Sequence, residues 1–99
     1  DLAAEAQDAV HRGLADALIV TGAATGAATD PERLVTVREA VPGATLYVGS
    51  GVQPDAVEGL RPHADGVIVG TWLKRDGKVS EPVDIERVRT LRAALDGAV

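Results

Sequence analysis

The sequence predicts an α/β fold in which helices alternate with the strands of a parallel sheet. Short apolar runs, typical of strands covered on both faces, alternate with segments whose apolar residues recur at helical spacing. Stretches that contain Pro or Gly separate the two kinds of segment. Hydrophobic residues make up 45% of the chain but aromatic residues only 2%, so small aliphatic side chains must form a thin core. The predicted order is α-β-α-β-α-β-α, with three parallel strands in one partial domain over residues 1–99.

The first helix and the first strand are expected in the N-terminal quarter of the chain. Apolar residues recur at helical spacing over residues 2–12, and Gly13 follows in the place where a glycine commonly ends a helix. Residues 17–21 form a short apolar run, which predicts a strand. This strand runs into a Gly-rich loop at residues 22–26.

A second helix is predicted at residues 31–41. Asp30 is a typical N-capping residue, and Pro31 suits the first helical position because its missing N–H would have no partner there. A Pro-Gly pair ends the helix. The second strand is then expected at residues 45–48, before a loop that contains two glycines.

The remainder of the chain predicts two more helices and one more strand. Residues 53–54 open a short helix, and the next apolar run, at residues 66–69, is the third strand. An irregular stretch follows. Residues 82–84 then cap a last helix whose apolar residues fall on one face.

Three parallel strands alone would leave two unpaired sheet edges, which proteins usually cover or close. A (β/α)8 TIM barrel removes the edges by closure, but it typically needs about 250 residues. Two copies of this chain would supply six strands instead of eight. We therefore expect the chain to be the C-terminal part of a TIM barrel, completed by a missing N-terminal part or functioning as a homo-oligomer.

Composition argues against several classes of protein. With 15 acidic and 10 basic residues the net charge is -5, and an acidic chain with few aromatic rings is a poor ligand for nucleic acid. The chain has no Cys, and its two His residues are far apart in the sequence, so we expect no metal and no cofactor. The apolar runs are too short to span a membrane, which predicts a cytoplasmic protein that is not integral to a membrane.

The loops after the second and third strands are the strongest candidates for a binding site. In a barrel the functional end lies at the C-terminal ends of the strands, and the last two loops often bind phosphate. Glycines there let backbone N–H groups approach an anion closely. The predicted phosphate-binding residues are Gly49, Ser50, Gly51, Gly70, Thr71 and Lys74. Lys74 is included because a helical turn over residues 71–74 would bring its charge to the anion; the alternative is that the glycines only form tight turns.

Other residues carry weaker signals. The loop after the first strand either lines a substrate pocket or is a plain connector, and its candidates are Thr21, Gly22, Thr25 and Gly26. Asp16 and Asp65 precede strands, at the opposite end of a barrel, where turn or capping roles are expected. Trp72 is expected to pack against the last helix, and Arg87 to lie on a solvated helix face.

No general base can be assigned from these loops. No His, Glu, Asp or Cys directly follows any of the three strands, and Ser50 and Thr71 alone cannot form a nucleophile–base pair. Whether the protein is an enzyme therefore stays open at this point. If it is, we expect its acid–base residues on the missing strands.

Several segments in a fixed order resemble the BtpA/SgcQ family. They are residues 16–22 (DALIVTG), 25–26 (TG), 48–52 (VGSGV), 65–71 (DGVIVGT), 73–78 (LKRDGK), 82–84 (PVD) and 87–88 (RV). The resemblance covers nearly the whole chain and implies a TIM barrel related to phosphate-binding barrels. It also implies that the six predicted phosphate-binding residues match the phosphate-site loops. Members of this family are often described as membrane-complex or photosystem I biogenesis proteins, and some as proteins of phosphoribosyl or sugar metabolism.

Three hypotheses for function follow. In the first, the parent barrel binds or acts on a phosphorylated sugar or a nucleotide-like metabolite. In the second, which only the resemblance motivates, it is a non-catalytic biogenesis or assembly factor for a membrane complex of the photosystem kind. In the third, the chain is a truncated product without a function of its own.

Overall fold

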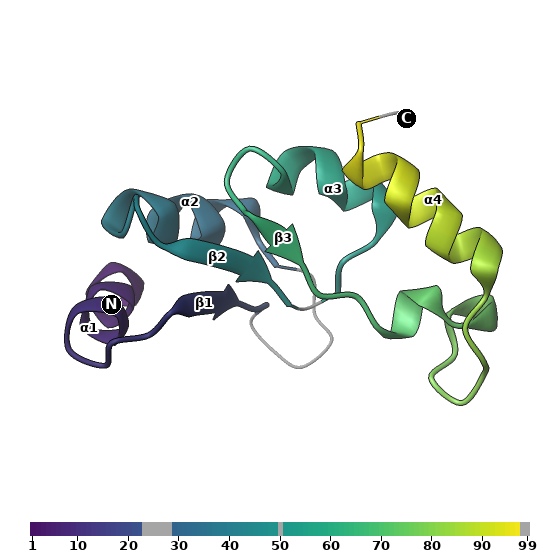
Figure 1. Cartoon of the computed structure of the whole chain (residues 1–99), viewed down its shortest axis with the longest axis horizontal. Helices are drawn as coiled ribbons and strands as arrows, with labels where there is room; N and C mark the ends of the chain where they lie inside the picture. Colours follow the sequence, from purple (N-terminus) through teal and green to yellow (C-terminus); the bar gives the residue numbers. More distant parts are fainter. Residues whose placement is uncertain (23–28, 50, 98–99) are drawn as a thin grey trace.

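The computed structural model describes residues 1–22, 29–49 and 51–97, and helices and strands alternate along it (Figure 1). The elements are α1 (Leu2–His11), β1 (Ala17–Val20), α2 (Pro31–Ala40), β2 (Thr45–Val48), α3 (Pro54–Leu60), β3 (Gly66–Val67), the 3-10 turns η1 (Thr71–Leu73) and η2 (Arg75–Gly77), and α4 (Ile85–Leu95). The strands form one parallel sheet in the order β1-β2-β3. The predicted α/β class and the order α-β-α-β-α-β-α with three parallel strands are confirmed.

The third strand is shorter than the sequence predicts. The apolar run covers residues 66–69, but β3 contains only Gly66 and Val67. The N–H of Ile68 still donates to the carbonyl of Val48 at 2.8 Å, and Val48 is the last residue of β2. Because β2 ends there, the remaining residues of the run have no strand beside them, and the chain turns toward η1.

Capping side chains fix the starts of the longer helices. The Asp30 carboxylate accepts a hydrogen bond from the N–H of Glu32 at 2.9 Å, at the start of α2. The Asp84 carboxylate accepts one from the N–H of Glu86 at 3.0 Å, at the start of α4. These bonds satisfy N–H groups that a helix cannot pair internally, so the helices begin where the sequence predicts.

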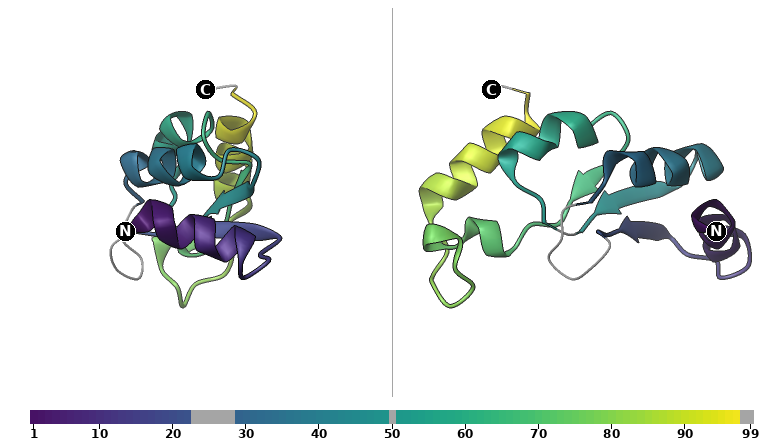
Figure 2. Two further views of the ribbon diagram at one scale, coloured as in Figure 1. Left: turned by 90° about the vertical axis from the view of Figure 1, so that its left-hand side faces the viewer. Right: turned by 180° about the vertical axis from the view of Figure 1, so that it is seen from behind.

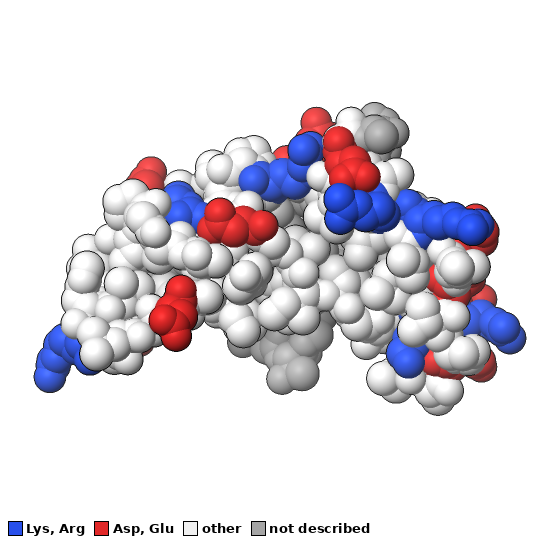
Figure 3. Space-filling view, in the orientation of Figure 1, with Lys and Arg blue, Asp and Glu red and all other residues white. Residues whose placement is uncertain are grey.

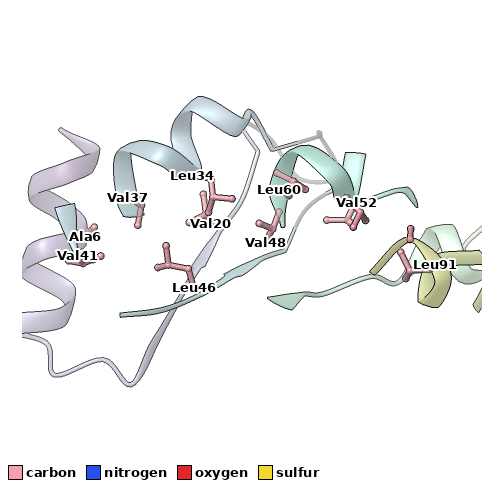
Figure 4. Close-up of a cluster of buried hydrophobic side chains, with 12 residues drawn as sticks. Ala6, Val20, Leu34, Val37, Val41, Leu46, Val48, Val52, Leu60 and Leu91 are labelled. Carbon is pink, nitrogen blue, oxygen red and sulfur yellow. The ribbon is translucent and has the colours of Figure 1, made fainter. Parts of the chain in front are cut away.

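The hydrophobic core is a single layer between the sheet and the helices on one of its faces. Figure 2 shows α2 and α3 on the same side of the strands, and Figure 4 shows the core side chains in a row between them. Leu34 from α2, Val57 from α3, and Leu46 and Val48 from β2 are fully buried. Leu91 of α4 lies apart from this row in Figure 4. The core is thin, as the small aliphatic composition predicts.

The other face of the sheet is apolar and exposed. Ile19 of β1, its register partner Tyr47 of β2, and Ile68, which directly follows β3, are 58%, 37% and 49% exposed. In Figure 3 the middle of the surface over the strands has no charged side chain, whereas Lys, Arg, Asp and Glu gather over α4 and along the upper edge. The sequence predicts strands covered on both faces, but the described residues cover only one. None of the helices in these described ranges has the length and apolar character needed to cross a membrane.

Candidate functional site

A cleft of about 610 Å³ lies where the chain leaves β2 and β3. The loop after β2 contributes Gly49, Gly51 and Gln53, and the segment after β3 contributes Gly70, Thr71 and Trp72. Parallel strands bring the loops at their C-terminal ends to the same edge of a sheet, and β2 and β3 are neighbours. The register of the sheet therefore brings these two loops together.

Four of the six predicted phosphate-binding residues line this cleft, namely Gly49, Gly51, Gly70 and Thr71. The fifth, Ser50, lies outside the described residues. The sixth, Lys74, is not among the residues that line the cleft. The expected turn over residues 71–74 does form, as η1, with the N–H of Lys74 donating to the carbonyl of Thr71 at 3.0 Å. Lys74 itself is extended and forms an antiparallel bridge with Val83.

The weaker candidates from the first loop lie elsewhere or are not described. Thr21 borders a smaller space between α1 and β1, and neither Thr21 nor Gly22 lines the main cleft. Thr25 and Gly26 lie outside the described residues. The loop after β1 therefore stays a candidate on sequence grounds alone.

Three glycines of the cleft differ in how their backbone conformation and surroundings would accept a side chain. Gly51 has a φ of 61°, in the left-handed region that favours glycine, so the turn itself requires it. At Gly49 an added Cβ would lie 2.7 Å from Cγ2 of Ile19, so the packing of the sheet requires it. At Gly70 an added Cβ would meet nothing within 4 Å. A tight turn accounts for Gly51, whereas the open space at Gly70 is available to a ligand.

Arg87 lines the cleft, which corrects its assignment to a solvated helix face. Its guanidinium lies 4.7 Å from the centroid of the Trp72 ring, and its Nη1 donates a hydrogen bond to the Trp72 carbonyl at 2.6 Å. Both residues are half-buried. The predicted packing of Trp72 against the last helix is thus made through Arg87. The contact joins segments 15 residues apart, so helical periodicity alone could not reveal it.

A carboxylate also borders the cleft. Asp76 lies in η2 with a φ of 56°, a left-handed conformation that Asp tolerates better than most residues. Asp76 is not among the predicted site residues, because it does not directly follow a strand. The Asp-Gly pair at residues 76–77 is a turn signal, and it could have indicated that the chain folds back there.

At the opposite end of the sheet, hydrogen bonds act on the carboxylate of Asp65. The Oδ2 atom of Asp65 accepts hydrogen bonds from the N–H of Leu46 at 2.9 Å and from Nη2 of Arg38 at 3.0 Å. These two hydrogen bonds lower the pKa of the Asp65 carboxyl below its usual range, and the bond from Leu46 contributes most. Arg38 also donates to the backbone carbonyls of His63, Pro42 and Ala44. Asp65 therefore has the structural role that its place before a strand predicts.

The described residues contain no candidate metal site. No group of three or more His, Asp or Glu side chains there could hold a metal ion. The chemistry that the cleft offers is that of backbone N–H groups, a hydroxyl, an amide, one guanidinium and one carboxylate. Apart from the carboxylate, these groups suit an anionic ligand.

Comparison with known proteins gives a consistent result along the chain. The BtpA family model matches residues 1–97. An uncharacterized protein of Thermococcus kodakarensis is 49% identical over 84 residues, which are 85% of this chain and 32% of that protein. Photosystem I biogenesis protein BtpA of Synechocystis is 39% identical over 89% of this chain and 31% of its own length. Putative sgc region protein SgcQ of Escherichia coli is 35% identical over 89% of this chain and 33% of its own length. The chain thus spans about a third of the length of these relatives.

Proposed function

The chain belongs to the BtpA family, and from this premise we propose that it supplies the phosphate-binding part of a TIM barrel. The ligand of the complete barrel is a phosphorylated sugar or a nucleotide-like metabolite. The observation that carries this proposal is the cleft, in which loops from two neighbouring strands and the guanidinium of Arg87 lie around one space. Its volume of about 610 Å³ is within the usual range for small-molecule sites.

Backbone groups of the cleft support an anionic ligand. Among the described residues, none accepts a hydrogen bond from the N–H of Gly51, Val52 or Thr71. Free N–H groups beside a cation are a favourable environment for phosphate oxygens. The helix after Gly51 adds little to this, since α3 has only seven residues and starts with Pro54, which has no N–H. The proposal therefore depends on the loops and on Arg87.

The test is to titrate the chain with inorganic phosphate and with ribose 5-phosphate and to measure binding of each by calorimetry. In Gly70→Asp, a carboxylate enters the cleft where an added Cβ meets no atom, so the fold should persist while like charges repel the ligand. We expect affinity to fall about tenfold or more.

Gly43→Asp is the matched control, because an added Cβ also meets nothing within 4 Å and Gly43 lies before β2, at the other end of the sheet. It should bind phosphate as tightly as the unmodified chain. Equal affinities in all three proteins would contradict a phosphate site in this cleft.

A second candidate function is a non-catalytic role in assembling a membrane complex. The observation that favours it is that the Synechocystis relative is named a photosystem I biogenesis protein. Under this alternative, the chain would bind purified photosystem I, and Gly70→Asp would leave that binding unchanged. Loss of binding in Gly70→Asp would instead tie the interaction to the cleft.

In both candidate functions this chain provides binding rather than a complete set of catalytic groups. Asp76 is the one titratable carboxylate among the described residues that line the cleft. A proton transfer would need a partner acid or base, and we propose that the strands outside this chain supply it.

A further inference from the structure

We propose that Arg87, held in place by Trp72, is the charged residue that binds the phosphoryl group in the cleft, the part that the sequence suggested for Lys74. This inference rests on the proposed function and adds the residue that recognises the ligand. It follows from how the guanidinium is held, from the donors it has left, and from the charges of its neighbours on α4.

Contacts on two sides hold the guanidinium before any ligand arrives. Its Cζ atom lies over the Trp72 ring, 4.7 Å from the centroid, and Nη1 donates to the Trp72 carbonyl at 2.6 Å. A Cβ added to Gly77 would come within 3.6 Å of Nη1, so the backbone of η2 also lies close to it. A side chain that is already ordered loses less conformational entropy when it binds a ligand.

Most of the hydrogen-bonding capacity of Arg87 is left for a ligand. A guanidinium has five N–H donors in a planar fork that matches two phosphate oxygens. Of the acceptors in the described ranges, only the Trp72 carbonyl takes a hydrogen bond from this side chain. The other donors, including those on Nε and Nη2, have no acceptor among the described residues, and the side chain lines the cleft.

Arg87 differs from the other arginines of α4 in its ion pairing. Arg89 forms an ion pair with Glu86, and Arg92 forms one with Asp96, each within one turn of the helix. Among the described residues, no carboxylate pairs with Arg87. The positive charge that faces the cleft is thus the one that α4 leaves without a counter-ion. An anionic ligand would supply that counter-ion.

Trp72 provides a direct measurement, because it is the only Trp in the chain. We would titrate the unmodified chain with inorganic phosphate and follow Trp fluorescence, then repeat the titration with Arg87→Gln, Arg89→Gln and Lys74→Gln. Arg89→Gln is the matched control, since it makes the same change on the same helix at an exposed, ion-paired position. Circular dichroism melts establish that each variant folds.

We expect Arg87→Gln to weaken phosphate binding about tenfold or more, as loss of a charge-assisted hydrogen bond should. Arg89→Gln and Lys74→Gln should stay within about twofold of the unmodified chain, the range of an exposed charge. Arg87→Lys keeps the charge but loses the planar fork, so it should lie between the two. If Arg87→Gln does not fold, the affinity of Arg87→Lys for phosphate is compared with that of the unmodified chain instead.

The outcomes separate this inference from the function on which it rests. If the unmodified chain binds phosphate and Arg87→Gln binds it equally well, the inference is wrong and the phosphate site stands. If Lys74→Gln loses binding instead, the charge comes from Lys74. If the unmodified chain gives no fluorescence change and no binding by calorimetry, the proposed function fails, and the inference with it.

Discussion

At the scale of single residues, Asp65 shows how one side chain holds separate elements together. Its Oδ2 atom accepts a hydrogen bond from the backbone N–H of Leu46, the second residue of β2, and another from Arg38 on α2. Arg38 in turn binds the carbonyl of His63, just before β3. The two side chains therefore connect β2, α2 and the approach to β3 at the end of the sheet opposite to the cleft.

Asp65→Asn should lower the melting temperature at neutral pH, because the amide cannot replace a charged acceptor of two hydrogen bonds. The pKa of Asp65 is lowered in the folded chain, so its stabilising effect is present above the pKa of the unfolded state and is lost as pH falls through the lowered folded pKa. The difference between the two proteins should therefore shrink in acid. Melts by circular dichroism across the acid range measure this.

Asp16→Asn is the control for this experiment, because Asp16 stands in the same position before β1 and is exposed like Asp65, but its side chain has no hydrogen bond among the described contacts. It should leave the melt unchanged at every pH. A pH-independent difference for Asp65→Asn would show that its charge is not what stabilises the fold.

Single residues also mark the limit of what the sequence could predict about the site. It was predictable that Gly49, Gly51, Gly70 and Thr71 lie around one cleft, because strand ends and glycines are local features and neighbouring parallel strands bring their loops together. Arg87 was not, because its position depends on the packing of α4 against η1. Local spacing in one sequence does not report contacts between separate elements.

At the scale of elements, the end of α1 departs from its sequence signal. Gly13 was expected to end the helix, but the left-handed conformation that often ends a helix is taken by Leu14, with a φ of 54°. The N–H of Gly13 donates to the carbonyl of Asp8 and the N–H of Ala15 to that of Ala9, both at 3.0 Å, so these carbonyls at the helix end are paired. Gly13 is needed for space instead, since an added Cβ would lie 2.9 Å from the Ala9 carbonyl oxygen.

Leu14→Asn should raise the free energy of unfolding by up to about 1 kcal/mol, because Asn tolerates the left-handed region and Leu does not. The Leu14 side chain is 77% exposed, so little apolar contact is lost. Leu14→Ala keeps the strain and should bring no gain. Urea unfolding of the three proteins measures the difference, and equal stability of the Asn and Ala variants would contradict this view of the helix end.

The extents of the elements were otherwise predictable to within a residue or two. Asp30 and Asp84 are local capping signals that act within their own helices, so the starts of α2 and α4 followed from sequence. The end of β3 did not, because it is set by where β2 stops, and pairing between strands is not a local property. The boundaries that failed are those set by a neighbouring element.

At the scale of the whole molecule, the chain is more open than a compact domain of its length. Its radius of gyration is 14.3 Å, whereas about 13 Å is usual for 100 residues. One face of the sheet carries the helices, and the other exposes Ile19, Tyr47 and Ile68. The curated relatives are about three times as long as the segment they share with this chain. We propose that the remainder of such a protein closes the barrel and turns this face into its interior.

Ile19→Lys tests that arrangement in two settings. In the chain alone the residue is 58% exposed, so the change should alter the free energy of unfolding by no more than about 0.5 kcal/mol. In a fusion where the chain replaces the matching third of the Thermococcus kodakarensis relative, the same Lys would be buried without a partner and should cost about 3 kcal/mol or more. A small effect in both settings would mean that nothing covers this face.

The measurement that tests the central claim most directly is a thermal melt of the unmodified 99-residue chain with and without millimolar inorganic phosphate. A ligand at about 100 times its dissociation constant adds about 2.7 kcal/mol to the native state that binds it. We predict a cooperative melt that phosphate shifts upward by several degrees, with chloride at equal ionic strength having no such effect. A melt that is the same in phosphate and in chloride would contradict a phosphate site formed by the loops after β2 and β3.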